Sequence, residues 1–473
     1  MNTRLFLLLA LLCVPRVLAQ ALPELGDVSG SAISPADERK LGESIMREIR
    51  RDPAYLDDAE VAEYANSLGA RLTARSDSAR QEFEFFVVRD GQINAFALPG
   101  GFIGIHTGLL LAAQSESEVA GVVAHEIAHV TQRHIARMIS QQGQSQLMSL
   151  ASMAIALLAS RSNSQVAEAA IAFGQAGVVQ NQLNFTRDNE READRVGVQL
   201  LDSAGFDPRG MASFFERLQR ATRVYEGGAP AYLRTHPLTF ERIGDIQGRV
   251  EQMPYRQVPD SLEFQLIRAK LRAENDTPRE AIVFFEASLG ERKFLSETAS
   301  RYGLVASLIR ARDYERAKRE LAPLRKTANP IIENLACRIP DAAGDAAQAL
   351  ACYEAARRLY PAPRALFYGQ IEQLLRLRRP AEALKLIDAR LQSQPDESRL
   401  YRLQAQAYAA QGNTLSQHRA QGEAYARAGQ IGAALEQFQI ALKSGQGDFY
   451  QLSAIEARIR ELRRTLIEQE RKR

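Results

Sequence analysis

His125-Glu126-Ile127-Ala128-His129 places two imidazoles four residues apart, with a carboxylate beside the first. On an α-helix, residues i and i+4 lie on one face about 6 Å apart along the axis, so both rings can bind one metal ion. Zinc accepts two neutral histidine nitrogens, and Glu126 would then act on a water at the metal as general base. The pattern predicts a zinc-dependent peptidase. The alternative is two solvated histidines on a surface helix.

A helix must hold these residues on one face. Ser115 and Glu118 have the S-x-x-E spacing of a capping box, which marks a helix start. No proline or glycine interrupts the chain between His125 and Arg137. Because apolar residues surround the histidines, we expect a half-buried helix whose histidine face is turned towards a cleft.

A catalytic zinc needs three protein ligands and one open position. The best candidate for the third ligand lies in residues 189–194. On a helix, Glu190, Asp194 and Gly197 share a face, while Glu192 points elsewhere. We therefore expect Glu190 to bind zinc and Asp194 to accept the outward N–H of a ligand histidine. The alternative is a charged, solvated helix with Glu–Arg pairs.

The H-E-x-x-H motif followed by E-x-x-x-D resembles the gluzincin metallopeptidases related to HtpX and the CAAX prenyl proteases. Residues 94–101 with 107–110 resemble the edge strand and turn before the active-site helix of that family, and residues 235–243 resemble its H-P-x-x-x-x-R element. The resemblance covers roughly residues 35 to 255. It implies a zincin-type helical metalloprotease domain with a small β-sheet and one zinc ion per chain.

The edge-strand segment has its own physical rationale. An exposed strand offers backbone N–H and C=O groups to which an extended peptide can add as a further strand. Such pairing would align a substrate across the zinc, and the candidate residues are Asn94, Phe96, Ala97 and Leu98. The two glycines that follow Pro99 are typical of a strand end and turn. An ordinary hairpin edge is the alternative.

Four further side chains have open roles. His236 precedes a proline and is an exposed residue, an oxyanion donor or a latch that fills the open zinc position at rest. Arg242 is a second oxyanion or positioning candidate, or a charge on a helix surface. We interpret His106 and His134 as structural or surface residues. His134 comes five residues after His129, which places it off the metal face of a continuous helix.

The first residues indicate export. Residues 1–19 contain Arg4, an apolar stretch and the cleavage signal Val17-Leu18-Ala19. The stretch is too short to span a bilayer, so we expect a soluble, exported protein. The resemblance implies the periplasm as its compartment, with the protein soluble or peripheral to the outer membrane. The formal net charge of +3 falls to about +1 without this segment, which argues against nucleic-acid binding.

The chain changes character around residues 254–260. Beyond this point the signature A-x-x-x-(large apolar) recurs at intervals of 36, 32, 34 and 51, beginning at Ala281, Ala317, Ala349, Ala383 and Ala434. A period near 34 indicates tetratricopeptide repeats, and the interval of 51 implies an extra helix at Gln417 to Arg427. A generic helical bundle is the alternative.

These patterns predict an α+β, mostly α, chain in three parts. They are a signal peptide over residues 1–19, a zinc metalloprotease domain over 20–255 and an all-α tetratricopeptide-repeat solenoid over 256–473. Cys337 and Cys352 fall on neighbouring helices of one repeat, and simple counting offsets them by about two turns. An oxidising compartment permits a disulfide, and the spacing leaves its formation open.

A solenoid supplies binding surface and no chemistry of its own. The resemblance implies unfolded or stalled outer-membrane β-barrel precursors and the barrel assembly machinery as partners. We predict a zinc endopeptidase combined with a chaperone-like assembly role. A repeat-based assembly scaffold with a normally silent peptidase is the alternative. Residues 139–184 are expected to form a lid over the cleft or an amphipathic segment in contact with a membrane surface.

Overall fold

The structure is a computed structural model, and it describes residues 33–75, 81–142, 187–222 and 231–471. The expected signal peptide lies outside the described residues. So does residue range 143–186, which holds most of the expected lid. Within the described ranges, no helix is both long enough and apolar enough to cross a bilayer.

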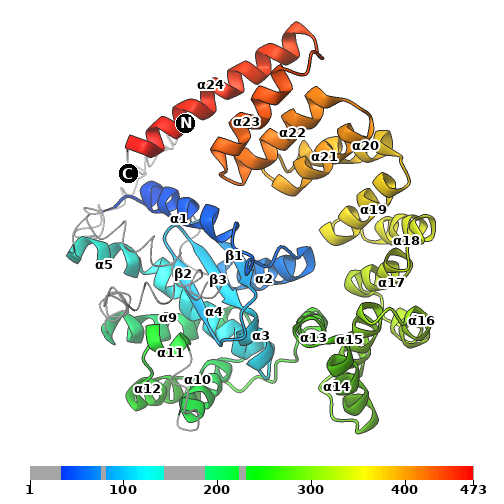
Figure 1. Ribbon diagram of the computed structural model, residues 1–473. Coiled ribbons are helices and arrows are strands. Elements are labelled where there is room, and N and C mark those ends of the chain that lie inside the picture. Colours follow the sequence, from blue (N-terminus) through cyan, green and yellow to red (C-terminus); the bar gives the residue numbers. More distant parts are fainter. Residues whose placement is uncertain (1–32, 76–80, 143–186, 223–230, 472–473) are drawn as a thin grey trace, which may run out of the picture.

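The first half of the chain packs helices around a small sheet (Figure 1). Its elements are α1 (Pro35–Ile49), α2 (Ala59–Thr73), β1 (Glu84–Val88), β2 (Ala95–Leu98), β3 (Phe102–His106), α3 (Thr107–Ala112), α4 (Glu116–Thr131), α5 (His134–Gln142), α9 (Arg187–Ser203), α10 (Arg209–Thr222), α11 (Ala231–Thr235) and α12 (Phe240–Glu251). This mixture confirms a mostly helical α+β fold with a small sheet.

The three described strands form a sheet in the order β1-β3-β2. β1 and β3 run parallel, whereas β2 pairs antiparallel with β3 from Ala95 opposite Ile105 to Leu98 opposite Phe102. Gly100 and Gly101 adopt φ of 77° and 87° in the turn between these strands, a conformation that favours glycine. The predicted strand end and turn are confirmed, and β2 is an edge strand of the described sheet.

Helix α4 begins where the sequence predicts. The Ser115 side chain accepts a hydrogen bond from the Glu118 backbone N–H. The other half of the capping box does not form, because the Glu118 carboxylate accepts from the Gln114 backbone and pairs with Arg217. The expectation of a half-buried helix is wrong. Every residue from Glu116 to Val130 is buried, because β2, α2, α9 and α10 all pack against α4.

Helix α4 ends without a proline or glycine. Gln132 closes it, Arg133 adopts a left-handed φ of 53°, and α5 begins at His134 in a new direction. The Arg133 guanidinium donates to the Ile33 carbonyl at 2.8 Å and lies 3.8 Å from the Glu38 carboxylate. These contacts hold a backbone conformation that residues with a side chain rarely adopt.

The second half is all helical. Its elements are α13 (Leu262–Asn275), α14 (Pro278–Gly290), α15 (Glu297–Arg310), α16 (Tyr314–Leu321), η3 (Leu324–Lys326), α17 (Pro330–Ala342), α18 (Ala346–Leu359), α19 (Arg364–Arg376), α20 (Pro380–Leu391), α21 (Ser398–Ala410), α22 (Thr414–Arg427), α23 (Ile431–Leu442) and α24 (Phe449–Arg471). The five signature alanines are completely buried, and α22 is the extra helix that the long interval predicts. A disulfide joins Cys337 to Cys352 across α17 and α18.

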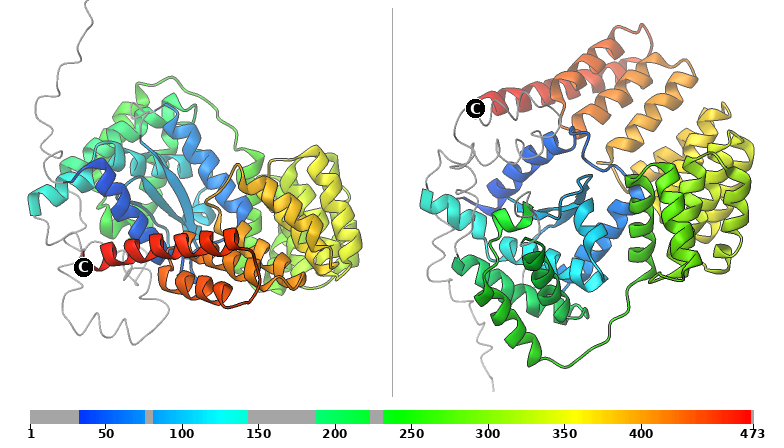
Figure 2. Two further views of the ribbon diagram at one scale, coloured as in Figure 1. Left: turned by 90° about the horizontal axis from the view of Figure 1, so that it is seen from above. Right: turned by 60° about the horizontal axis from the view of Figure 1, so that its bottom comes forward.

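The repeats form an arc around the peptidase half, and α24 returns to the neighbourhood of α1 (Figure 1; Figure 2). An extended connection over residues 254–261 leads from α12 to α13 (Figure 2, right). The two halves share one apolar core, in which the rings of Tyr64 on α2 and Phe264 on α13 lie 6.1 Å apart. The inner side of the arc therefore packs directly on α2.

Candidate metal centre

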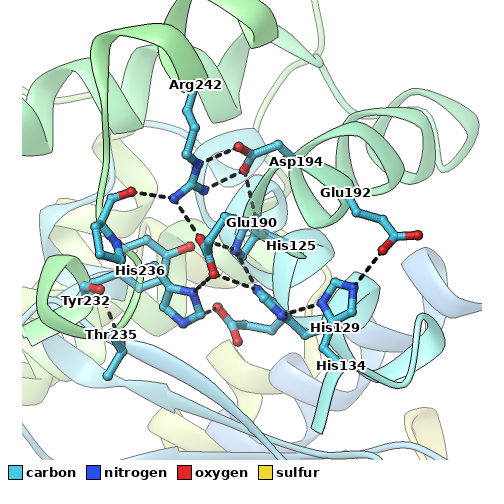
Figure 3. A network of polar contacts seen from close by, with 12 residues as sticks. His125, His129, His134, Glu190, Glu192, Asp194, Tyr232, Thr235, His236 and Arg242 are labelled. Carbon is cyan, nitrogen blue, oxygen red and sulfur yellow. Dashed lines mark hydrogen bonds and ion pairs between the residues drawn. The ribbon is translucent and has the colours of Figure 1, made fainter. Parts of the chain in front are cut away.

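The predicted site residues come together from three helices and one loop (Figure 3). The H-E-x-x-H residues lie on α4, Glu190 and Asp194 lie on α9, His236 directly follows α11, and Arg242 lies on α12. Gly197 allows α9 to lie against α4, because a Cβ atom there would stand 3.2 Å from the His125 backbone nitrogen.

Four side chains point their donor atoms at one small volume. The Nε2 atoms of His125 and His129 are 3.0 Å apart, and the Glu190 carboxylate lies 3.5 Å and 3.3 Å from them. His236 approaches the same carboxylate with Nδ1 at 2.9 Å. All four ligand atoms lie within 4.8 Å of one another, and all four side chains are buried. Two or more imidazoles with a carboxylate are a donor set that suits a transition-metal ion such as zinc.

His125 is oriented by an ion pair behind it. Its Nδ1 lies 3.0 Å from the Asp194 carboxylate, which in turn receives two hydrogen bonds from Arg242 at 2.7 and 2.8 Å. Because a carboxylate only accepts, His125 carries its hydrogen on Nδ1 and presents the Nε2 lone pair to the cluster when it is neutral.

Arg242 also pairs with Glu190 at 2.6 Å and donates to the Pro237 carbonyl at 2.8 Å. Its side chain is buried, so the alternative of a helix-surface charge is wrong. The contacts fit a positioning role, because they join two carboxylates of α9 to the loop that carries His236.

His129 is oriented by a different group. Its Nδ1 lies 2.8 Å from Nδ1 of His134, and Nε2 of His134 lies 3.1 Å from the Glu192 carboxylate. His134 is completely buried, so the surface interpretation is wrong. It reaches His129 because the helix breaks at Arg133, which brings the fifth residue back towards the cluster. Burial lowers the pKa of His134 to about 4, which keeps the imidazole neutral at pH 7.

The charges of the cluster favour a cation. The buried carboxylates of Glu190 and Asp194 contact one guanidinium, that of Arg242, and the buried carboxyl group of Glu126 lies beside the same cluster, so acidic groups outnumber the guanidinium. Burial lowers the pKa of His125, but contacts with Asp194 and Glu190 outweigh it and raise that pKa to about 9. The cluster therefore attracts positive charge, as a site for a divalent metal must.

Glu126 lies beside the cluster and is completely buried. Burial raises the pKa of its carboxyl group, which makes the carboxylate a stronger base. Nε2 of His236 stands 3.6 Å from Glu126. The His236 ring lies 5.1 Å from the His129 ring and stacks on Tyr232 at 4.7 Å. His236 thus stands between Glu126 and Glu190, and Tyr232 covers the His236 ring.

The edge-strand candidates lie next to α4. Asn94 directly precedes β2, Phe96 and Ala97 are half-buried in it, and Leu98 is buried. The Phe96 ring meets the His106 ring edge-on at 5.8 Å. His106 is buried with Nδ1 3.3 Å from the Asp90 carboxylate, so its surface interpretation is wrong and its structural one holds.

Sequence reasoning missed Tyr232 and the contacts of His134 with Glu192. Tyr232 lies in the short helix α11, three residues before the motif at residues 235–243 and outside it. The signal for His134 was present as a third histidine near the motif, but a continuous helix would have turned it away from the metal face.

Comparisons with known proteins agree with this geometry. The profile of Peptidase family M48 matches residues 59–250. The chain is 32% identical to the Beta-barrel assembly-enhancing protease of Escherichia coli (strain K12) over 450 residues, which are 94% of this chain and 92% of that protein. The chain belongs to the β-barrel assembly-enhancing proteases of peptidase family M48. The resemblance drawn from four ordered motifs is confirmed, and this M48 protein is a metalloendopeptidase.

Two further relatives match shorter parts of the chain. The Putative beta-barrel assembly-enhancing protease of Vibrio cholerae serotype O1 is 41% identical over 275 residues, 58% of this chain and 57% of that protein. The Mitochondrial metalloendopeptidase OMA1 of Schizosaccharomyces pombe is 33% identical over 196 residues, 41% of this chain and 54% of its own. Members of family M48 with different names therefore resemble this chain over different lengths.

Proposed function

We propose that this M48 peptidase is a zinc endopeptidase in which His125, His129 and Glu190 bind zinc and Glu126 is the general base. The observation that carries the proposal is the buried cluster of donor atoms within 4.8 Å of one another, with Glu126 beside it. The donor set and the excess negative charge fit a divalent cation. A bound zinc ion would supply a Lewis acid that polarises the scissile carbonyl.

The chain's own residues supply positioning and proton transfer. Glu126 accepts a proton from the attacking water and returns it to the leaving nitrogen. Asp194, held by Arg242, fixes the ring of His125. The edge strand β2 aligns an extended substrate by adding its backbone as a further strand, with Asn94, Phe96, Ala97 and Leu98 along the contact.

We propose that His236 is a latch that keeps the site closed at rest. Its ring stands between Glu126 and Glu190, with Nδ1 2.9 Å from Glu190, in space that a substrate carbonyl would need. Replacing His236 with Ala should raise basal cleavage of an unfolded protein. A fall in cleavage would instead support an oxyanion donor.

The burial of the cluster favours a second candidate function. With His125, Glu126 and His129 completely buried, a resting protein would cleave slowly and act mainly as a repeat-based assembly scaffold. In that case Glu126→Gln would retain most of the assembly function in cells. Under the endopeptidase proposal, the same variant accumulates stalled substrates.

We propose the periplasm as the compartment. The proposal rests on the signal-peptide pattern in residues 1–19 and on the Cys337–Cys352 disulfide, because disulfides persist in oxidising compartments. The name of the Escherichia coli relative points to β-barrel assembly. The proposed substrates are unfolded or stalled outer-membrane β-barrel proteins, and the proposed partner is the barrel assembly machinery. Contact with a membrane would be peripheral.

The experiment compares wild type with Glu126→Gln. Metal analysis should find one zinc ion per chain in both proteins, because Glu126 is not a proposed ligand. Wild type should degrade an unfolded outer-membrane barrel protein slowly, because His236 closes the site at rest, and Glu126→Gln should not degrade it at all. Equal degradation by both would refute the role of Glu126, and no zinc in wild type would refute the metal assignment.

A further inference from the structure

A line of side chains runs from the cluster of metal-binding side chains to the surface of α9 (Figure 3). Nδ1 of His129 lies 2.8 Å from Nδ1 of His134, and Nε2 of His134 lies 3.1 Å from Oε2 of Glu192. Arg137 donates to the same Glu192 oxygen at 2.8 Å. These residues come from α4, α5 and α9, so the line joins three elements behind one ring of the cluster.

The direction of each hydrogen bond follows from the end of the line. Glu192 accepts from Arg137 and, as a carboxylate, has no hydrogen to donate. His134 must therefore carry its hydrogen on Nε2 and, when neutral, hold a lone pair on Nδ1. That lone pair accepts a hydrogen from Nδ1 of His129. The His129 hydrogen is thus kept on the outer nitrogen, and the inner Nε2 presents a lone pair to the cluster.

We propose that His134 is a positioning residue for the metal centre, a neutral imidazole that fixes the tautomer and ring orientation of His129 by accepting its outer N–H. This inference rests on the proposed function, in which His129 binds zinc. It assigns each imidazole on α4 its own partner, a carboxylate for His125 and an imidazole for His129.

The local backbone is built to place this ring. Arg133, with its left-handed φ of 53°, turns the chain so that His134 lies behind His129. The two ring centroids are 4.8 Å apart at an interplanar angle of 78°. A side chain that only filled space would need neither a donor facing one ring nitrogen nor a carboxylate facing the other. The presence of both partners favours a directional role.

The test measures zinc affinity in the full chain by competition with a chromophoric chelator. His134→Leu removes the acceptor and should weaken zinc binding about 10- to 100-fold, the usual cost of losing a group that orients a metal-binding histidine. His134→Asn can place its Oδ1 near the position of the imidazole Nδ1, so it should recover most of the lost affinity. His418→Leu is a matched control, because His418 lies on α22 and contacts Gln437.

Thermal unfolding of the metal-free proteins shows whether a loss of zinc affinity is accompanied by a loss of folding stability. If His134→Leu and His134→Asn weaken zinc binding equally, or if neither weakens it, the proposal is wrong while the zinc peptidase stands. If wild type binds no zinc, the proposed function fails and the inference falls with it. Should His134→Leu not fold, Glu192→Ala breaks the line at a half-exposed residue, and unchanged zinc affinity in that variant overturns the proposal.

Discussion

At the scale of single residues, the cluster of metal-binding side chains depends on charges that are buried and paired. Arg242 is the one guanidinium among the buried cluster residues described above, and it contacts both Asp194 and Glu190. Removing one member of a buried ion pair leaves the other without compensation, which is far more costly than losing an exposed pair.

We therefore expect Arg242→Met to lower the free energy of unfolding by about 3–5 kcal/mol. Denaturant unfolding of the metal-free protein measures it. Arg191→Met is the matched control, because the exposed Arg191–Glu241 pair at 2.8 Å also joins α9 to α12 and should cost about 0–1 kcal/mol. Equal losses in the two variants would contradict the account of Arg242.

At the scale of elements, the break between α4 and α5 decides what surrounds the site. The capped start of α4 and the shared face of Glu190 and Asp194 follow from local spacing, so the sequence predicts them. The break has no proline or glycine and depends on contacts of Arg133 with residues about 100 positions away, so local patterns do not reveal it. Local patterns do not reveal the contacts of Arg242 either, because its carboxylate partners lie on another helix.

This break can be tested with paired substitutions. Arg133→Gly and Arg133→Val both lose the side-chain contacts, but only valine is strained at a φ of 53°. We expect Arg133→Val to be about 1–2 kcal/mol less stable than Arg133→Gly and to bind zinc more weakly, because His134 is displaced. Arg292 has the same φ at the end of α14, far from the site. Its Val and Gly variants should differ in stability but not in zinc affinity, and a shared loss of zinc would contradict the argument.

At the scale of the whole molecule, the repeats are joined to the peptidase half by polar contacts at the start of α2. Lys270 on α13 is buried and pairs with Asp58 and Glu60 at 2.6 Å each. Asn334 on α17 donates to Glu60 at 2.8 Å. The period of the sequence predicts the repeats. It gives no signal for how the repeats pack against α2, because these contacts join residues more than 200 positions apart.

Lys270→Met should lower the free energy of unfolding by about 3–5 kcal/mol, because it leaves the buried carboxylate of Glu60 and the half-buried carboxylate of Asp58 without their cation. Denaturant unfolding followed by circular dichroism measures the loss. Arg402→Met is the control, since the exposed pair of Arg402 with Asp57 at 3.1 Å should cost about 0–1 kcal/mol. A Lys270→Met protein as stable as this control would show that the two halves do not depend on the buried cluster.

The binding of one zinc ion by His125, His129 and Glu190 is tested most directly by anomalous scattering from crystals of the purified protein, recorded on both sides of the zinc absorption edge. We expect one peak per chain, about 2.0–2.1 Å from the Nε2 atoms of His125 and His129 and about 2.0–2.2 Å from a Glu190 carboxylate oxygen. A zinc-loaded crystal without a peak at these three side chains would contradict it.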